Sequence, residues 1–282
     1  MSRTLILLSH KRSGTTALFR AFQEHPQVKV CHWNQEIRIW EPNFWNLAAR
    51  AIEGDVEPFR SRLAESHPFL DVPRSPTKDD IFDLWDQSLA RLGPVLFDKS
   101  PQYLGNRSAL NLIRQYRDGG RDVRFFAVIR NPEDVIASQY EVLGRGSRRH
   151  AIERWRRLVQ EFRHLEDDSL ERRETHWLAK NDHLFELITK GENIPIFRYE
   201  DLAAAPHVYM PHIFHHCGVE HVPESYADFH PTNVGRRRRS TDREVRNWRP
   251  GARLAKAMAF YGYSTAISGP HGLGRFAQCF RR

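Results

Sequence analysis

The sequence predicts an α/β domain in which a central parallel sheet is flanked by helices. Short continuous apolar runs, such as Leu5–Leu8 and Phe125–Ile129, alternate with amphipathic segments of helical period along most of the chain. Strands that are buried on both faces of a parallel sheet have this pattern. The length of 282 residues suits one such domain with an ample core. We therefore expect a single domain over residues 1–282.

The first predicted strand is Thr4–Leu8, and the helix Thr15–Gln23 opens directly from the loop that follows it. The other predicted strands are Gln27–Cys31, Val95–Phe97, Val123–Ile129 and Ile194–Phe197. The other predicted helices are Ser108–Arg117, Pro132–Val142, His150–Leu165 and Thr175–Thr189. Ligands of such sheets bind beyond the carboxyl ends of the strands. This rule gives the loops at 9–14, 98–101 and 130–131 a common location.

Residues 33–93 interrupt the alternation of strands and helices. This segment is rich in Trp and Phe and is punctuated by prolines. It predicts a helical insertion beside the site that these loops form. Its aromatic residues either line a cover or acceptor pocket, or form a packing layer.

The composition points to a soluble cytoplasmic protein with an anionic ligand. A formal net charge of +8 favours nucleotides, nucleic acid, acidic surfaces, or sulfated and phosphorylated substrates. Three widely spaced cysteines argue against a disulfide framework or a zinc site. The four histidine and cysteine residues of segment 212–217 lack a nearby carboxylate that would complete a metal site. Neither a targeting segment nor a membrane span is visible.

The loop "SHKRSGTT" after the first strand has the features of an anion site. A helix N-terminus presents N–H groups and a positive dipole to an anion. Gly14 allows a close approach of the backbone, and Thr15 and Thr16 add hydroxyl groups. A magnesium-dependent phosphate loop would place a lysine directly after the glycine. Here the cations Lys11 and Arg12 precede the glycine, so an NTPase is disfavoured; the remaining alternative is a plain surface turn.

A second anion site is predicted after the strand "VRFFAVI". Arg130 follows this strand, and Ser138 lies eight residues later on the next helix. A magnesium enzyme would usually carry a carboxylate at such a strand end, whereas an arginine offers a fork to a phosphate. The other carboxylate candidate, Asp98, is followed at once by Lys99. Two anion sites suit a nucleotide with phosphates at two separated positions.

Four motifs together resemble the sulfotransferases that use 3′-phosphoadenosine 5′-phosphosulfate (PAPS): "KRSGTT", "FDKSPQY", "FFAVIRNPEDVIAS" and "FRYEDL". The resemblance implies a P-loop-like sulfotransferase fold. It also implies that the first loop grips the 5′-phosphosulfate and that Arg130 and Ser138 hold the 3′-phosphate. The cofactor-binding residues that it implies are Arg12, Ser13, Gly14, Thr15, Thr16, Arg130, Ser138, Tyr199, Arg239, Ser240 and Thr241. Lys11, which precedes Arg12 in the loop, joins this set because it adds one more positive charge.

Within that family the chain looks most like tyrosylprotein sulfotransferases and bacterial sulfotransferases. The loop is followed by His25-Pro26, and Glu36-Ile37-Arg38 is similar to their catalytic Glu-x-Arg, although it lies three residues later. Lys11 stands where they usually have proline, and Val142 stands where they have a further arginine. The tyrosylprotein sulfotransferases are also membrane-anchored, and no such anchor is visible here. The likeness therefore supports the chemistry more than the substrate.

The resemblance assigns the following catalytic roles. Glu36 would take the proton of the acceptor hydroxyl, with His32 or His10 as the rival base. Arg12 and Lys99 would neutralise charge on the bridging oxygen, and Ser240 would hydrogen-bond there. PAPS would be converted to adenosine 3′,5′-bisphosphate (PAP), with no metal required.

Two other functions remain open at this point. One is a magnesium-dependent nucleotide or small-molecule kinase with a degenerate phosphate loop. The other is a non-catalytic polyanion binder that uses its basic surface, including the arginine run 236–239. For a sulfotransferase, we expect a small-molecule, lipid or sugar acceptor rather than nucleic acid. The sequence names neither that acceptor nor the oligomeric state.

Overall fold

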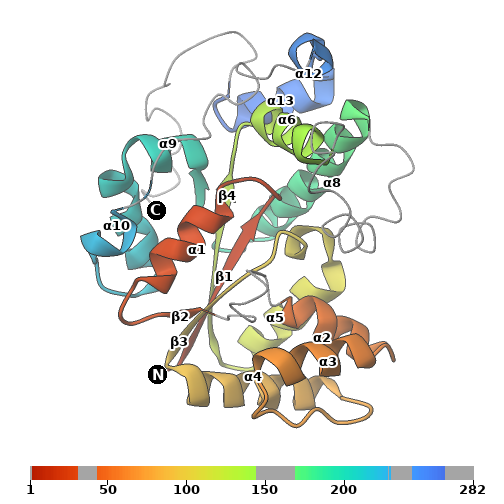
Figure 1. Cartoon of the computed structure of the whole chain (residues 1–282), viewed down its shortest axis with the longest axis vertical. Coiled ribbons are helices and arrows are strands. Elements are labelled where there is room, and N and C mark those ends of the chain that lie inside the picture. The colour runs from red at the N-terminus through yellow and green to blue at the C-terminus, as the bar shows by residue number, and fades with distance from the viewer. Residues whose placement is uncertain (1, 31–42, 144–168, 228, 230–242, 264–282) are drawn as a thin grey trace, which may run out of the picture. The chain divides into compact units, whose positions relative to one another are not determined.

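The structure is a computed structural model that describes residues 2–30, 43–143, 169–227, 229 and 243–263 (Figure 1). The chain divides into two compact units. The first unit comprises residues Met1–Ile129 and Glu186–Pro231, and the second comprises Arg130–Phe185 and Thr232–Arg282. Each unit is described by itself below.

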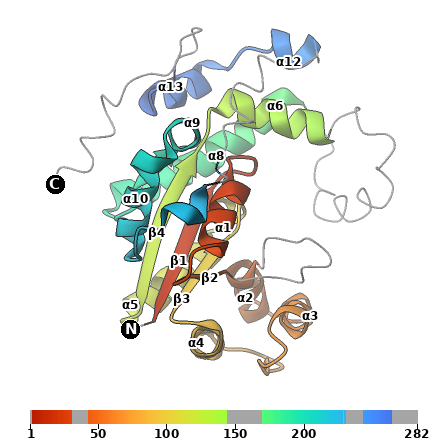
Figure 2. The same cartoon turned by 60° about the vertical axis from the view of Figure 1, so that its left-hand side comes forward.

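The first unit contains a five-stranded sheet with the order β2-β3-β1-β4-β5. Every pairing in this sheet is parallel. The sheet confirms the predicted fold class. Because the strands are parallel, their carboxyl ends all lie at the same edge of the sheet (Figure 2). The strands are β1 (Arg3–Ser9), β2 (Lys29–Val30), β3 (Val95–Lys99), β4 (Asp122–Ile129) and β5 (Ile196–Arg198).

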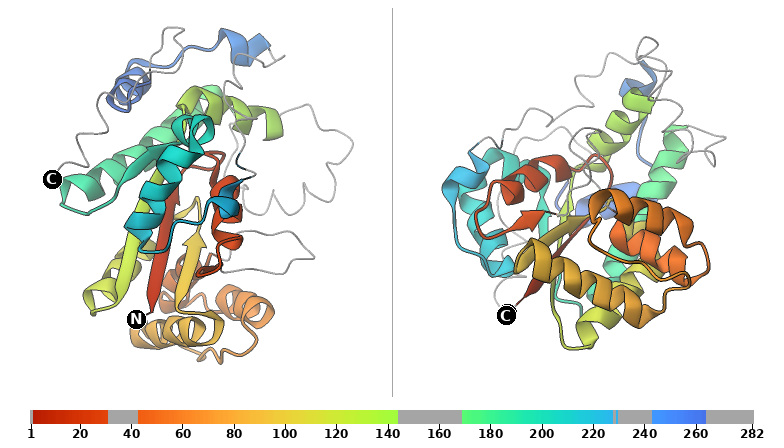
Figure 3. Two further views of the ribbon diagram at one scale, coloured as in Figure 1. Left: turned by 90° about the vertical axis from the view of Figure 1, so that its left-hand side faces the viewer. Right: turned by 60° about the horizontal axis from the view of Figure 1, so that its bottom comes forward.

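Helices cover both faces of this sheet (Figure 3). On one face, Phe22 of α1 stacks on Phe97 with 4.4 Å between ring centroids and meets the edge of Phe214 from α10. On the other face, the indole N–H of Trp85 from α4 donates to the hydroxyl of Thr4 over 2.8 Å. The helices of this unit are α1 (Thr15–Gln23), α2 (Phe44–Ile52), α3 (Glu57–Ser66), α4 (Lys78–Leu92), α5 (Arg107–Asp118), α9 (Tyr199–Ala204) and α10 (Pro206–Cys217).

The described part of segment 33–93 contains the helices α2, α3 and α4, and its aromatic residues form a packing layer. Phe44 lies 4.7 Å from Trp85, and Trp45 lies 5.3 Å from Tyr116 of α5, measured between ring centroids. None of these four side chains is more than 1% exposed, so all four are buried in the core. The other two tryptophans of the segment, Trp33 and Trp40, lie outside the described residues.

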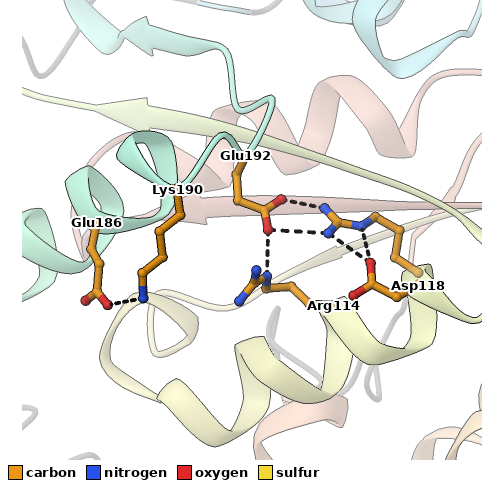
Figure 4. A network of polar contacts seen from close by, with 6 residues as sticks. Arg114, Asp118, Glu186, Lys190 and Glu192 are labelled. Carbon is orange, nitrogen blue, oxygen red and sulfur yellow. Dashed lines mark hydrogen bonds and ion pairs between the residues drawn. The ribbon is translucent and has the colours of Figure 1, made fainter.

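A buried carboxylate ties the segment before β5 to α5. Glu192, 7% exposed at its side chain, accepts hydrogen bonds from Arg114 and Arg117 (Figure 4). Burial alone would raise the pKa of Glu192, but the hydrogen bonds and charges of the two arginines outweigh it and hold the pKa below its usual value. The contact fixes where β5 enters the sheet.

Four elements differ from their predicted bounds by two or more residues at one end. β2 begins at Lys29 rather than Gln27. β3 runs to Lys99 because its polar end still pairs in register with β1, Leu7 facing Lys99. β5 begins at Ile196 rather than Ile194, because Pro195 has no N–H and joins the sheet only by its carbonyl, which accepts from the Ala127 N–H over 2.9 Å. The helix α8 (Leu170–Thr189) begins five residues before the predicted Thr175. The predicted helix at 150–165 lies outside the described residues.

The second unit contains α6 (Pro132–Leu143), most of α8, α12 (Arg243–Asn247) and α13 (Ala252–Phe260). The carboxylate of Glu174 on α8 accepts the Gly251 N–H over 3.0 Å at the start of α13. Trp177 of α8 meets the edge of Tyr261 just after that helix. These contacts pack α13 on α8. Among the described residues, no helix is long and apolar enough to cross a membrane.

One buried histidine makes the stability of the fold depend on pH. His67 ends α3 and is 1% exposed. The hydroxyl of Ser66 donates to the Arg62 carbonyl, so the Nδ1–H of His67 donates to that hydroxyl over 2.8 Å. Its Nε2 is buried without a partner among the described residues. Burial lowers the pKa of His67 from 6.5 to about 4.

We therefore expect the free energy of unfolding to fall as pH drops from 6.5 to 4. In this window the unfolded chain binds a proton at His67 and the folded chain does not, which costs about 1.4 kcal/mol per pH unit. Above pH 6.5 both states are neutral and the term vanishes. Urea unfolding at pH 7 and pH 4.5 measures the difference, and the variant His67→Leu supplies the control. Equal pH dependence in both proteins would contradict this assignment.

Candidate active site

The loop between β1 and α1 has the backbone of an anion-binding turn. It runs from His10 to Gly14, and both Arg12 and Gly14 have positive φ, at 73° and 85°. The first N–H groups of a helix have no partner inside the helix. Gly14 is the N-cap of α1 and has no side chain that could accept a hydrogen bond from them. A helix start of this kind favours an anion. Lys11 is half-buried and Arg12 is exposed at the same turn.

A buried hydroxyl group in this loop fits such an anion. Ser13 is fully buried, and its Oγ has no hydrogen-bond partner among the described residues. A buried hydroxyl without a partner is costly, and most such groups in folded proteins are satisfied. An oxygen of a bound phosphate or sulfate would accept this hydrogen bond. Thr15 is also buried, whereas Thr16 is exposed on the first turn of α1.

Tyr199 packs against the same glycine. It follows β5 directly and begins α9, and its side chain is 3% exposed. A Cβ atom on Gly14 would lie 2.1 Å from Cδ2 of the Tyr199 ring. The glycine is therefore required twice, by its left-handed backbone and by this contact. Arg198 and Asp201 form a two-pronged ion pair, with contacts of 2.7 and 2.6 Å, that holds the start of α9.

The end of β3 presents a cation and a carboxylate to opposite faces of the sheet. Lys99 is 2% exposed, and its ammonium lies over the ring of Phe19 on α1, 5.5 Å from the centroid. Asp98 is also buried and accepts a hydrogen bond from the hydroxyl of Tyr103. Because neighbouring strand residues alternate between faces, only Lys99 points toward the α1 face. Asp98 thus has a structural partner on the other face.

Directly after Lys99 lies a polar cluster that the sequence analysis missed. The hydroxyl of Ser100 accepts from the Asn46 amide and from the Gln102 N–H, each over 3.2 Å. It donates in turn to Oδ1 of Asn43. The signal in the sequence is Asn46, a polar residue in the otherwise apolar helix start "FWNLAA" of α2. Asn46 is 4% exposed.

The second unit begins with the residues predicted to hold the second anion. Arg130 is 3% exposed, and its guanidinium lies 3.4 Å from the carboxylate of Asp134. Ser138 is 1% exposed and lies one turn after Asp134 on α6. The side chain of Asn131 accepts the Glu133 N–H over 2.9 Å and thereby begins the helix. Arg130 thus lies just before α6, and Ser138 lies in the second turn of that helix.

Five candidate residues lie outside the described residues. They are Glu36 and its rival His32, and Arg239, Ser240 and Thr241. The other rival base, His10, is described and is 2% exposed at the start of the loop. Among the described residues, no group of three or more His, Cys, Asp or Glu side chains could hold a metal ion.

Comparison with known proteins identifies the family. A sequence profile described as "Sulfotransferase family" matches residues 5–224, which is most of the chain. The chain belongs to the sulfotransferase family. The resemblance carried by the loop, the two strand ends and the Tyr199 motif is thereby confirmed. Among curated proteins, none matches the sequence of this sulfotransferase.

Solved structures share the fold of this sulfotransferase at low sequence identity. The sulfotransferase domain from the curacin biosynthetic pathway is 14% identical with a TM-score of 0.57, over 94% of this chain and 99% of that one. The sulfotransferase domain of the Synechococcus PCC 7002 olefin synthase is 17% identical with a TM-score of 0.58, over 93% and 96%. A sulfotransferase from Alicyclobacillus acidocaldarius is 18% identical with a TM-score of 0.50, over 94% and 97%.

The His-Pro pair after α1 has a structural role in this sulfotransferase. His25 is 2% exposed, and its Nδ1 accepts the Gln27 N–H over 3.2 Å. Its Nε2–H therefore donates to the carbonyl of Glu220, over 2.9 Å. The Glu220 N–H returns a hydrogen bond to the Gln27 side chain. His25 thus ties the end of α1 to the segment after α10, and both its ring nitrogens are occupied.

Proposed function

We propose that this sulfotransferase transfers a sulfuryl group from PAPS to a hydroxyl group of an acceptor, with an amine as the less favoured alternative. The observation that carries the proposal is the buried Ser13 hydroxyl, which has no partner in the described structure and lies directly before Gly14, the N-cap of α1. Lys11 and Arg12 precede it, and the chain lacks a lysine after the glycine. These features fit an anion bound by N–H groups, hydroxyls and fixed cations.

The residues divide between the two ends of the nucleotide. Residues 11–16 would hold the 5′-phosphosulfate, and the ring of Tyr199 would support the loop at Gly14. Arg130 and Ser138 would hold the 3′-phosphate, because a guanidinium and a hydroxyl both donate to phosphate oxygens. The family resemblance adds Arg239, Ser240 and Thr241 to the cofactor-binding set.

In the proposed reaction PAPS supplies an activated sulfuryl group. The bond between sulfur and the bridging phosphate oxygen breaks, a bond from the acceptor oxygen to sulfur forms, and PAP leaves with the electron pair. Lys99 and Arg12 would stabilise the negative charge that grows on the bridging oxygen, with Ser240 hydrogen-bonded to the same region. Glu36 would receive the acceptor proton, and His10 and His32 are the rival bases.

The chain's own cations supply the positive charge for this reaction, so we propose that it requires no metal. The buried ammonium of Lys99 is well suited to the task, because a charge has a larger effect where water is excluded. For the acceptor we propose a cytoplasmic small molecule, lipid or sugar that carries a hydroxyl group.

A comparison of nucleotide affinities tests the proposal. Isothermal calorimetry in EDTA should give micromolar or tighter binding of PAP and at least tenfold weaker binding of adenosine 5′-phosphate. The variant Arg130→Ala should remove most of that difference. Tighter binding of ATP that requires magnesium would instead indicate a kinase. Salt-dependent binding of DNA, without binding of either nucleotide, would indicate a polyanion binder.

The acceptor class is tested with radiolabelled PAPS. A panel of phenols, alcohols, sugars and amines is offered to the enzyme with [35S]PAPS in EDTA, and PAP release and labelled product are measured. The proposal expects turnover above the rate with water for at least one hydroxyl acceptor. Faster turnover with amines than with any hydroxyl compound would overturn the acceptor assignment.

A further inference from the structure

We infer that Asn43 and Asn46 are positioning residues that orient Lys99 through the hydroxyl of Ser100. The inference rests on the proposed function, because Lys99 is a catalytic group only if sulfuryl transfer occurs. It adds a role for α2, a helix to which neither the motifs nor the resemblance assigned one. All the residues concerned lie in the first unit.

The hydroxyl of Ser100 has every hydrogen-bonding direction assigned. Its one proton goes to Oδ1 of Asn43, and its two lone pairs accept from the Asn46 amide and the Gln102 N–H. A serine hydroxyl can make no further bond. The direction of each bond is therefore fixed, and the turn after β3 is clamped to the first turn of α2.

The two asparagines are hydrogen-bonded to each other at the start of α2. They are three residues apart, and the Asn46 amide also donates to Oδ1 of Asn43 over 3.2 Å. Asn43 stands at the N-cap of α2 with a positive φ of 56°, a conformation that asparagine tolerates better than most residues. Its side chain makes no cap hydrogen bond to α2. The side chain of an N-cap asparagine normally accepts a hydrogen bond from a backbone N–H of its own helix, whereas the side chain of Asn43 accepts one from the Ser100 hydroxyl.

Lys99 gains from this clamp because its backbone lies at the very end of β3. Lys99 is the last residue of β3, and it pairs with Leu7 of β1. The residue after it is no longer part of the sheet. The Ser100 cluster supplies the missing restraint one residue later. A lysine has four rotatable side-chain bonds, so a fixed backbone and the ring of Phe19 together limit where its ammonium can lie. A misplacement of such a group by about 1 Å is enough to reduce a reaction rate about a hundredfold.

The Asn46 amide also has a feature that a purely structural role leaves unexplained. Its nitrogen makes two hydrogen bonds, whereas its Oδ1 is buried with no partner among the described residues. Replacing Asn46 by leucine would relieve that unsatisfied oxygen, so stability alone gives little reason for the amide. Orientation of the Ser100 hydroxyl does give a reason.

A double-mutant cycle between Asn46 and Lys99 tests the inference. The readout is PAP release from [35S]PAPS, with the best hydroxyl acceptor of the panel and, separately, with water as the acceptor. In the wild-type background Asn46→Ala should lower kcat about tenfold and change the KM for PAPS less than about twofold. In a Lys99→Met background the same substitution should lower kcat by less than about twofold, because its effect passes through Lys99.

Two further variants separate positioning from general stability. Ser100→Thr keeps the hydroxyl and should retain most of kcat, whereas Ser100→Ala should resemble Asn46→Ala. The control Thr77→Ala removes the hydrogen bond from the Asp80 N–H that caps α4, so it should lower Tm without lowering kcat. The two variants Ser100→Thr and Ser100→Ala test the inference even if Asn46→Ala does not fold.

The outcomes are distinguishable. An equal loss of kcat for Asn46→Ala in both backgrounds, or a Ser100→Ala protein with normal kcat, overturns the inference and leaves the proposed function intact. A wild-type protein that neither binds PAP nor releases it from PAPS overturns the proposed function, and the inference falls with it.

Discussion

Lys99→Met is expected to lower kcat for sulfuryl transfer by a factor of about 10² to 10³, the range seen when one preorganised charge-stabilising group is removed. Methionine has nearly the length of lysine and can remain over the Phe19 ring, so the fold should persist. The KM for PAPS should change much less than kcat, because in the proposed mechanism the charge of Lys99 acts mainly as the bridging oxygen becomes negative. Steady-state PAP release and calorimetric PAP affinity measure the two effects separately.

The matched control for this prediction is Lys190→Met. Lys190 is exposed, and its ammonium pairs with Glu186 over 2.7 Å (Figure 4). The substitution makes the same chemical change on the surface and should leave kcat unaltered. If Lys99→Met retained wild-type kcat, or lost PAP affinity and kcat to the same degree, Lys99 would not be the group that stabilises the leaving oxygen.

Gly14→Ala is expected to weaken PAP binding at least tenfold, in a protein that remains folded. The added Cβ would lie 2.1 Å from the ring of Tyr199, so the loop or the ring must move. The φ of +85° adds strain of about 1 kcal/mol for any residue with a Cβ. Both effects displace the first N–H groups of α1, which we propose hold the 5′ end of the nucleotide. Calorimetric titration with PAP and thermal unfolding give the two readouts.

Gly191→Ala separates backbone strain from the collision with Tyr199. Gly191 has a φ of +86°, nearly that of Gly14, but a Cβ there meets no atom within 4 Å. This variant should lower Tm slightly and leave PAP affinity unchanged. Equal affinities for PAP in the two variants would mean that the contact between the loop and Tyr199 has no part in nucleotide binding.

Local patterns were sufficient to predict most of the sheet. The apolar run before the loop gave β1, and the helix Thr15–Gln23 has the predicted bounds, because the loop and Gly14 mark its start sharply. β4 and α5 each came within one residue of their bounds. The strand order could not be predicted in the same way, since it depends on which strands pair at a distance.

The residues proposed to bind the first anion are neighbours in sequence, whereas the contacts that hold the loop and the end of β3 join distant residues. Lys11, Arg12 and Gly14 lie within a few residues of each other, so sequence spacing alone indicates their chemistry. Ser100 and its two asparagines lie 54 and 57 residues apart in sequence. Only the packing of α2 brings them together, and no local pattern encodes it. The contact between Tyr199 and Gly14 also joins residues that lie far apart in the sequence, so no local pattern predicts it.

The alternation of Asp98 and Lys99 at the end of β3 makes the site depend on strand register. Lys99 faces α1 because Leu7 pairs with it, and Asp98 faces the other way because Ile6 pairs with it. A slip of β3 by one residue would exchange their faces and place a carboxylate where the ammonium now lies. The sign of the charge on the α1 face at the end of β3 is thus set by backbone pairing between two buried strands. In the proposed mechanism, a core substitution that shifted this register would replace a positive charge by a negative one without changing Lys99 or Asp98 themselves.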